Sequence, residues 1–132
     1  MIAKSLGTPS DAYKVVEFAH VLDVRGCGAE AVHLLDEFNA TGVLADAIRG
    51  NFYRSVGDLN KAIYFLESSV RQSPQDPWFR HALAITYARQ GQRESTIAQL
   101  QAALEFNPQF QPARDLLGCL SAAADPKQCV IP

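Results

Sequence analysis

The sequence predicts an all-α protein built from repeated helical hairpins. Three observations support this prediction. Identical residues recur at a fixed spacing of 34 residues, apolar residues between them follow the helical period, and glycine and proline stand where such helices would have to end. No stretch shows the alternating apolar pattern of a strand. We therefore expect a stack of helix pairs.

The period is carried by residue types that punctuate structure. Three identical pairs lie 34 residues apart: Tyr53 and Tyr87, Gly57 and Gly91, and Pro74 and Pro108. Small residues share the spacing, at Gly50, Ala84 and Gly118. Such self-similarity is typical of solenoids, in which each repeat buries its apolar face against the next repeat.

The first expected element is a degenerate hairpin over residues 12–42. Aligning Gly26 with the later turn glycines places five residues at interior positions: Phe18, Ala19, Leu22, Ala31 and Leu35. The link to the next unit is three residues shorter than the period requires, and no proline closes it. This hairpin therefore follows the pattern only loosely.

Residues 43–76 and 77–110 are expected to form two regular repeats. In each, a glycine can adopt the left-handed backbone of a tight turn after the first helix. A proline then prevents the second helix from continuing. Residues 111–124 read as a lone amphipathic helix that covers the last exposed apolar face. We expect residues 125–132 to form a loose tail, unless Val130 and Ile131 dock on a partner or a second copy.

The two regular units resemble tetratricopeptide repeats. The residues that match the family pattern are Gly50, Tyr53, Ala62, Leu66, Ser69 and Pro74 in the first unit, and Ala84, Tyr87, Thr96, Leu100, Ala103 and Pro108 in the second. The resemblance implies a right-handed α-solenoid of about three hairpins plus a C-terminal capping helix. Small residues at these positions let helices approach closely. Replacing Gly118 or Ala62 by leucine should therefore cost about 1–3 kcal/mol through overpacking.

One pair departs from the family pattern. Asp46 and Arg49 occupy positions that are usually apolar. We expect an ion pair between residues i and i+3 at a wet or displaced contact between units. A kink in the stack is the alternative.

Composition excludes several classes of function. Lys and Arg total 12 and Asp and Glu total 14, for a formal net charge of -2, so the broad basic surface of a nucleic-acid binder is missing. No apolar run is long enough to span a membrane or serve as a signal peptide, and we expect a cytoplasmic protein. The three widely spaced cysteines, Cys27, Cys119 and Cys129, are expected to be reduced thiols.

Catalytic and metal-binding patterns are also missing from the sequence. His20, His33 and His81 have no cysteine or carboxylate at zinc-ligand spacing, and no C-x-x-C motif occurs. Cys27, between two glycines and near Arg25, could be a reactive thiol, but a small residue in a turn is the simpler interpretation. We expect no enzyme activity, no cofactor and no metal site.

The family resemblance implies that the first helix of each hairpin lines a concave, partner-binding surface. The expected partner-binding residues on it are Tyr13, His20, Asn51, Arg54, Trp78, His81, Ile85 and Arg89. Trp78 is a candidate hot spot, the alternative being that it packs on Pro77 and the neighbouring hairpin. Arg54 and Arg89, with His81, could meet a carboxylate or an acidic peptide, or could be solvated surface charges.

The resemblance therefore predicts a non-catalytic module that binds a protein or peptide of unknown identity. Only Asn51 matches the clamp that some family members use for chaperone tails, so we expect no binding of those tails. Two alternatives remain: a chaperone or assembly subunit of a larger secretion or enzyme complex, and a homo-oligomeric scaffold.

Overall fold

The computed structural model describes residues 9–130, which form seven α-helices, one short 3-10 helix and no strand. The helices are α1 (Pro9–Val24), α2 (Gly28–Glu37), α3 (Val43–Ser55), α4 (Leu59–Gln72), α5 (Pro77–Arg89), α6 (Arg93–Phe106) and α7 (Gln111–Ala122), followed by η1 (Pro126–Cys129). The predicted all-α helical-repeat solenoid is confirmed.

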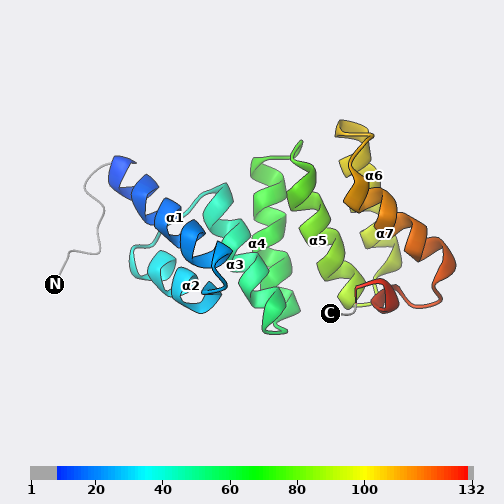
Figure 1. Cartoon of the computed structure of the whole chain (residues 1–132), viewed down its shortest axis with the longest axis horizontal. Coiled ribbons are helices and arrows are strands. Elements are labelled where there is room, and N and C mark those ends of the chain that lie inside the picture. Colours follow the sequence, from blue (N-terminus) through cyan, green and yellow to red (C-terminus); the bar gives the residue numbers. More distant parts are fainter. Residues whose placement is uncertain (1–8, 131–132) are drawn as a thin grey trace.

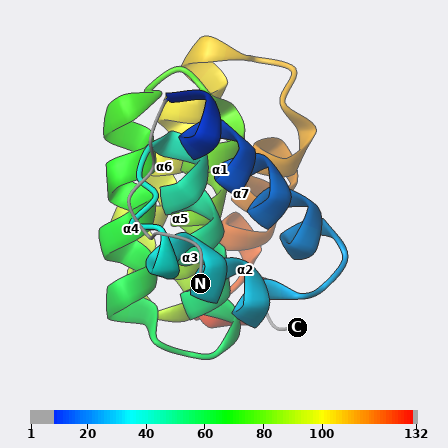
Figure 2. The ribbon, with the colours of Figure 1, turned by 90° about the vertical axis from the view of Figure 1, so that its left-hand side faces the viewer.

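The helices follow one another along the stack in chain order (Figure 1). Each packs on the next, and α1 also packs on α3, as α3 does on α5. Viewed along the stack, α4 and α6 lie on one side and α1 and α7 on the other (Figure 2). We call α1, α3, α5 and α7 the first helices, because each begins a hairpin or, for α7, occupies the equivalent place. Among them, α1, α3 and α5 pack on one another in turn, and α5 and α7 share a pocket and both pack on η1.

Local chemistry defines where the hairpins turn. Gly57 and Gly91 adopt φ angles of 89° and 80°, in the left-handed region that glycine enters without a steric penalty. The Asp58 side chain accepts a hydrogen bond from the Lys61 N–H at the start of α4. The Asp76 side chain does the same for the Trp78 N–H at the start of α5. The turn residues expected from the sequence therefore act as predicted.

The two helices of the second hairpin, α3 and α4, approach each other closely at Gly50. A β-carbon there would lie 2.6 Å from Cγ of Leu66, which is itself fully buried. At the equivalent places in the next hairpin, Ala84 and Leu100 are also fully buried. The expected small-residue contacts are confirmed in these two hairpins.

Two of the expected interior positions are wrong. A β-carbon added at Gly118 would meet no neighbouring atom within 4 Å, because no described helix packs on that side of α7. The overpacking predicted for leucine at this position is therefore not expected. Phe18 is 58% exposed, whereas its neighbour Ala19 is fully buried. Successive helical residues point about 100° apart, so the turn of α1 that buries Ala19 directs Phe18 outward.

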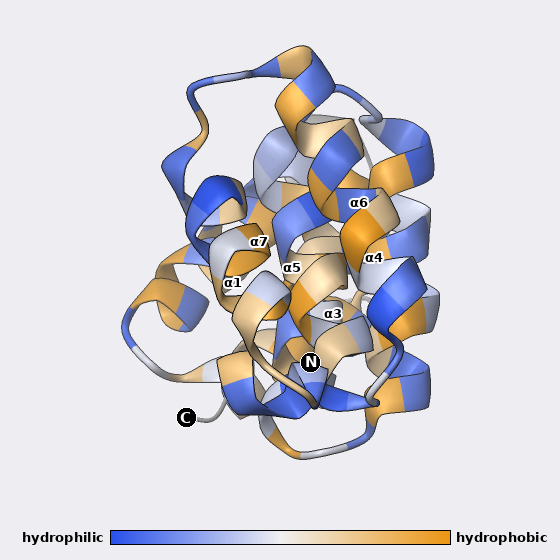
Figure 3. Cartoon of the chain, turned by 90° about the vertical axis from the view of Figure 1, so that its right-hand side faces the viewer, coloured by the Kyte–Doolittle hydropathy of each residue, from blue (hydrophilic) through white to orange (hydrophobic). Residues whose placement is uncertain are grey.

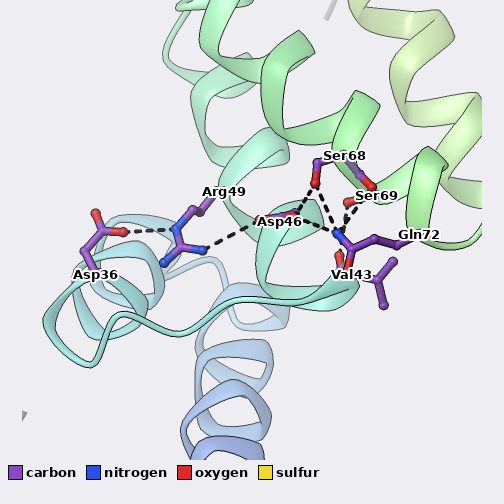
Figure 4. Close-up of polar contacts among 7 residues, drawn as sticks. All are labelled: Asp36, Val43, Asp46, Arg49, Ser68, Ser69 and Gln72. Atoms are coloured by element: carbon purple, nitrogen blue, oxygen red, sulfur yellow. Dashed lines mark hydrogen bonds and ion pairs between the residues drawn. The ribbon is translucent and has the colours of Figure 1, made fainter. Parts of the chain in front are cut away.

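An ionic network centred on the buried Arg49 joins the first hairpin to the second (Figure 4). Arg49 is only 7% exposed, and its Nε donates to Asp36 Oδ1 at 3.0 Å. Its Nη1 lies 3.8 Å from Asp46 Oδ1. Asp46 in turn accepts hydrogen bonds from Ser68 Oγ at 2.7 Å and Gln72 Nε2 at 2.8 Å. The predicted i,i+3 pair is present, with a buried arginine and with Asp36 as a second, exposed carboxylate partner.

A second polar contact joins the second hairpin to the third. The Tyr87 hydroxyl on α5 donates to Glu67 Oε2 on α4 at 2.7 Å. Burial, together with this hydrogen bond to a carboxylate, raises the pKa of Tyr87 to about 12. The phenol therefore remains protonated and able to donate across the physiological pH range.

The C-terminal segment is ordered where a loose tail was expected. Residues Pro126–Cys129 form η1, with a capping box between Asp125 and Gln128, and Pro126 is buried. Cys129 is joined to Cys119 by a disulfide with an S–S length of 2.01 Å. The expectation of three reduced thiols is therefore wrong for this pair, and Cys27 alone is free among the described cysteines. Ile131, also expected in the tail, lies outside the described residues.

Within residues 9–130, no helix has the length and apolarity needed to cross a membrane. Figure 3 shows hydrophilic and hydrophobic residues interleaved along the helices. This is the pattern of helices that bury one face and expose the other.

The close approach at Gly50 can be tested with a matched pair of substitutions. Gly50→Ala should lower the free energy of unfolding by about 1–3 kcal/mol, because the new methyl group must displace Leu66. Gly118→Ala, with open space around it, should instead stabilise the protein by up to about 1 kcal/mol, since alanine favours helix over glycine. Urea unfolding of both variants measures the difference, and equal effects would contradict this packing.

Candidate partner-binding groove

The predicted partner-binding residues all come from first helices. Tyr13 and His20 lie on α1, Asn51 and Arg54 on α3, and Trp78, His81, Ile85 and Arg89 on α5. Five of them lie in three places along the face of the first helices: Tyr13 at a cleft beside α1, Arg54 and Arg89 between α3 and α5, and His81 and Ile85 in a pocket between α5 and α7. We call the face as a whole the groove.

The α5–α7 pocket has a volume of about 380 Å³. Its lining consists of His81, Ile85, Pro112, Asp115, Leu116, Cys119, Cys129 and Val130. Most of these side chains are apolar, and the disulfide forms part of the wall. His81 and Asp115 supply polar groups. A largely apolar pocket with a few polar groups is the usual form of a site that takes one side chain or a small ligand.

Trp78 stands near this pocket and is both packed and exposed. Its ring meets the Phe110 ring edge to face, with centroids 4.8 Å apart, and the His81 ring at 6.3 Å. Phe110 is buried, so it provides a fixed support. Nevertheless 61% of Trp78 remains exposed. The tryptophan therefore packs on Phe110 and still presents a large surface, and its role as a hot spot stays a prediction.

His81 is uncharged near neutral pH. Burial lowers the pKa of His81, and the positive charge of Arg54 lowers it further. A neutral imidazole offers one donor and one acceptor. His81 therefore contributes hydrogen bonding to the pocket rather than positive charge, which must come from the arginines.

Arg54 and Arg89 link α3 to α5. Arg54 Nη1 donates to the Ala82 carbonyl at 3.2 Å, and Arg89 Nη1 donates to the Arg54 carbonyl at 2.9 Å. Burial and the charge of Arg89 lower the pKa of Arg54, although a guanidinium keeps its proton. Within residues 9–130, neither arginine forms an ion pair with a carboxylate. Each arginine is therefore held by a backbone carbonyl, and its charge is not balanced by a carboxylate within the described residues.

Asn51 precedes Arg54 by one helical turn on α3. Its Oδ1 atom is buried and has no hydrogen-bond partner within the described residues. A buried acceptor without a partner carries a desolvation penalty.

Tyr13 and His20 are not brought into the α5–α7 pocket. Tyr13 is exposed and borders a separate cleft of about 520 Å³, between α1 and the segment that leads into α3. His20 is exposed on α1 and acts electrostatically on Asp23, where it partly opposes the effect of burial, which raises the pKa of Asp23. The predicted set therefore includes residues at opposite ends of the stack.

Several residues at the pocket were not among the predicted binding residues. They are Phe110 beside it and, in its lining, Pro112, Asp115, Leu116, Cys119, Cys129 and Val130. The Asp125–Gln128 capping box was a local indication that the tail is ordered. Nothing local in the sequence indicates where that ordered tail would pack.

Two further features of the described residues concern metal binding and the region around Arg49. No group of three or more His, Cys, Asp or Glu side chains could hold a metal ion there. Another cleft, of about 600 Å³, lies beside Arg49, where Asp46, Ser68 and Gln72 hydrogen-bond with one another.

The fold and the groove define a helical-repeat protein of the kind that presents a long surface to a partner. The family model described as tetratricopeptide repeat matches residues 53–118, half of the chain. The chain belongs to the tetratricopeptide repeat family, whose repeats generally mediate protein–protein interaction. No curated protein matches the sequence.

The lowered pKa of His81 predicts a pH dependence of stability. The unfolded chain takes up a proton near the ordinary pKa of 6.5, which the folded protein does not bind until lower pH. The contribution of His81 to stability is therefore present above pH 6.5 and is lost as the pH falls below it. His81→Asn should lose less stability than the wild type between pH 7.5 and 5.0 in thermal melts. His33→Asn, an exposed change on α2, should behave as the wild type does, and three identical pH profiles would contradict the assignment.

Proposed function

We propose that the chain is a non-catalytic module that holds a peptide segment of a protein partner along the groove. The observation that carries this proposal is the exposed Trp78 beside a largely apolar pocket between α5 and α7. The partner places one large apolar side chain in that pocket and an acidic group near Arg54 and Arg89. No cofactor and no nucleic acid take part.

The apolar anchor is supported by the composition of the pocket. Ile85 on α5 and Leu116 on α7 provide dispersion contacts, and Trp78 adds a large rigid surface next to them. Tryptophan dominates the hot spots of protein interfaces because it buries much area with few rotatable bonds. His81 and Asp115 can orient the main chain of the bound peptide by hydrogen bonding.

The acidic group is supported by the two arginines. Each guanidinium uses one N–H group on a backbone carbonyl and has further N–H donors available. Two adjacent positive charges without a carboxylate favour an anionic partner, and a charge-assisted hydrogen bond is stronger than a neutral one. An acidic peptide is therefore preferred over a basic one.

The disulfide is relevant to the cellular compartment in which the protein functions. Disulfides persist in oxidising compartments, whereas cytoplasmic thiols are kept reduced. A cytoplasmic location, as expected from the sequence, implies that Cys119 and Cys129 spend much of their time as thiols.

Self-association is a second candidate function. Phe18, Val21 and Val24 are exposed on α1, and contiguous exposed apolar residues often mark an interface. Light scattering of the purified chain measures its mass directly. We expect a dimer or larger species at high concentration if this face is used, and a strict monomer would reject the candidate.

The groove assignment is tested on the partner recovered by crosslinking from the source cells. Trp78→Ala should weaken binding of that partner by about 30-fold, corresponding to the loss of a hot spot of roughly 2 kcal/mol. Tyr64→Ala is the matched control, because Tyr64 is 66% exposed but lies on α4, outside the groove. Isothermal titration calorimetry gives both dissociation constants.

Unchanged melting temperatures must accompany these measurements, so that a loss of binding is not a loss of fold. If Trp78→Ala binds as tightly as Tyr64→Ala, the groove is not the binding surface. Arg89→Glu examines the acidic contact separately, since it should weaken binding and reduce the dependence of affinity on salt.

A further inference from the structure

The segment Asp125–Val130, which we call the C-terminal strap, folds back toward the groove. We propose that the strap is a redox-released cover for the α7 end of the groove, held down by the Cys119–Cys129 disulfide and freed when that bond is reduced. This inference rests on the proposed function of the groove, and it adds a means of regulating it.

The strap lies on the binding face of the solenoid. Its helix η1 packs on α5 and α7, two consecutive first helices. In Figure 1 the strap, in red, turns back beneath α7 toward the lower end of α5. Cys129 and Val130 line the α5–α7 pocket together with Ile85 and also pack against the core of the last hairpin. The strap therefore forms one wall of the α5–α7 pocket and covers part of the apolar surface there.

The strap begins at a fixed point. The Arg93 guanidinium donates to the carbonyls of Leu120 and Ala123 at 2.6 Å each, and to that of Ala124 at 3.0 Å. These contacts hold the end of α7 and the residues just after it. Reduction would leave this anchor in place, so release is confined to the residues that follow Ala124.

Beyond that anchor, the strap is attached without hydrogen bonds to the groove. Its hydrogen bonds within the described residues are all internal, from the backbone N–H groups of Asp125, Lys127, Gln128 and Val130 to acceptors inside the strap. What joins it to α5 and α7 is the disulfide and the apolar contacts of Pro126, Cys129 and Val130. A segment attached in this way depends strongly on its covalent bond.

The disulfide is open to a dithiol reductant. Cys119 is exposed and Cys129 is half-buried. A thiolate of the dithiol attacks Sγ of Cys119 and forms a mixed disulfide, while the S–S bond breaks and the Cys129 sulfur leaves as a thiolate that takes up a proton. The second thiol of the reductant then displaces Cys119 as a thiol. Two protein thiols are formed, and the dithiol is oxidised to its cyclic disulfide.

The size of the effect follows from loop closure. The two cysteines are separated by 10 residues in the sequence. Closing a loop of about ten residues lowers the conformational entropy of the released state. This favours the docked strap over the released strap by about 100-fold. Reduction should therefore lower the ratio of docked to released strap by about that factor and uncover Ile85 and Leu116.

Hydrogen exchange of the whole chain tests release without any partner. Oxidised protein is compared with protein reduced by dithiothreitol, by mass spectrometry of peptides that cover the strap and each helix. We expect exchange of the strap amides to accelerate at least 10-fold on reduction, while α3 to α6 keep their protection. Unchanged exchange of the strap would overturn the proposal. So would a general loss of protection in α5 to α7, because the disulfide would then hold the fold together.

Exposure of the covered face is measured with 8-anilinonaphthalene-1-sulfonate, which combines an apolar ring system with an anionic group. Its fluorescence should rise several-fold on reduction. Cys129→Ser should give the high signal with or without dithiothreitol, and Cys27→Ser, which keeps the disulfide, should respond as the wild type does. A released strap with unchanged dye fluorescence would show that it covers nothing. Neither readout uses the partner, so failure of the Trp78 experiment is distinguishable from failure here.

Discussion

The stack depends on how closely the two helices of each hairpin approach. At Gly50 the space left for a β-carbon is already taken by Leu66, and Ala84 and Ala103 meet a similar requirement in the next hairpin. Close approach allows extensive dispersion contact at native packing density. It also sets the first helices side by side, because each hairpin repeats the same geometry. The groove is thus a consequence of small residues that lie beneath it.

Where the repeat pattern fails, polar contacts replace apolar ones. The short link after the first hairpin leaves an irregular junction, and Arg49 fills it with its guanidinium between Asp36 and Asp46. A buried charge is costly unless paired and hydrogen-bonded, and here both carboxylates and the donors Ser68 and Gln72 complete the set. The irregular hairpin is therefore joined to the regular ones by directional bonds. Arg54 and Arg89 likewise join α3 to α5 by hydrogen bonds to backbone carbonyls. In the proposed function their remaining N–H groups bind the partner.

The C-terminal end of the stack raises a different problem. A solenoid must cover its last apolar face, and α7 does so with Leu116 and Leu120 turned toward the preceding hairpin. The strap adds Cys129 and Val130 to the same cluster. One short segment therefore serves the core and borders the binding face. Because of this dual position, oxidation or reduction of the Cys119–Cys129 disulfide can affect the groove.

The sequence by itself determined the hairpins, because helix periodicity, turn glycines and terminating prolines act over a few residues. It also indicated the first-helix positions of Trp78, His81 and Ile85, since those depend only on helical register. It did not determine that Phe18 faces outward, that Gly118 has open space, or that Arg49 is buried, because each depends on which element packs opposite. The order of the tail was missed for the same reason. Only the tertiary structure decided that Cys129 returns to Cys119, since that pairing depends on where the chain turns after α7 and on the apolar surface that receives it.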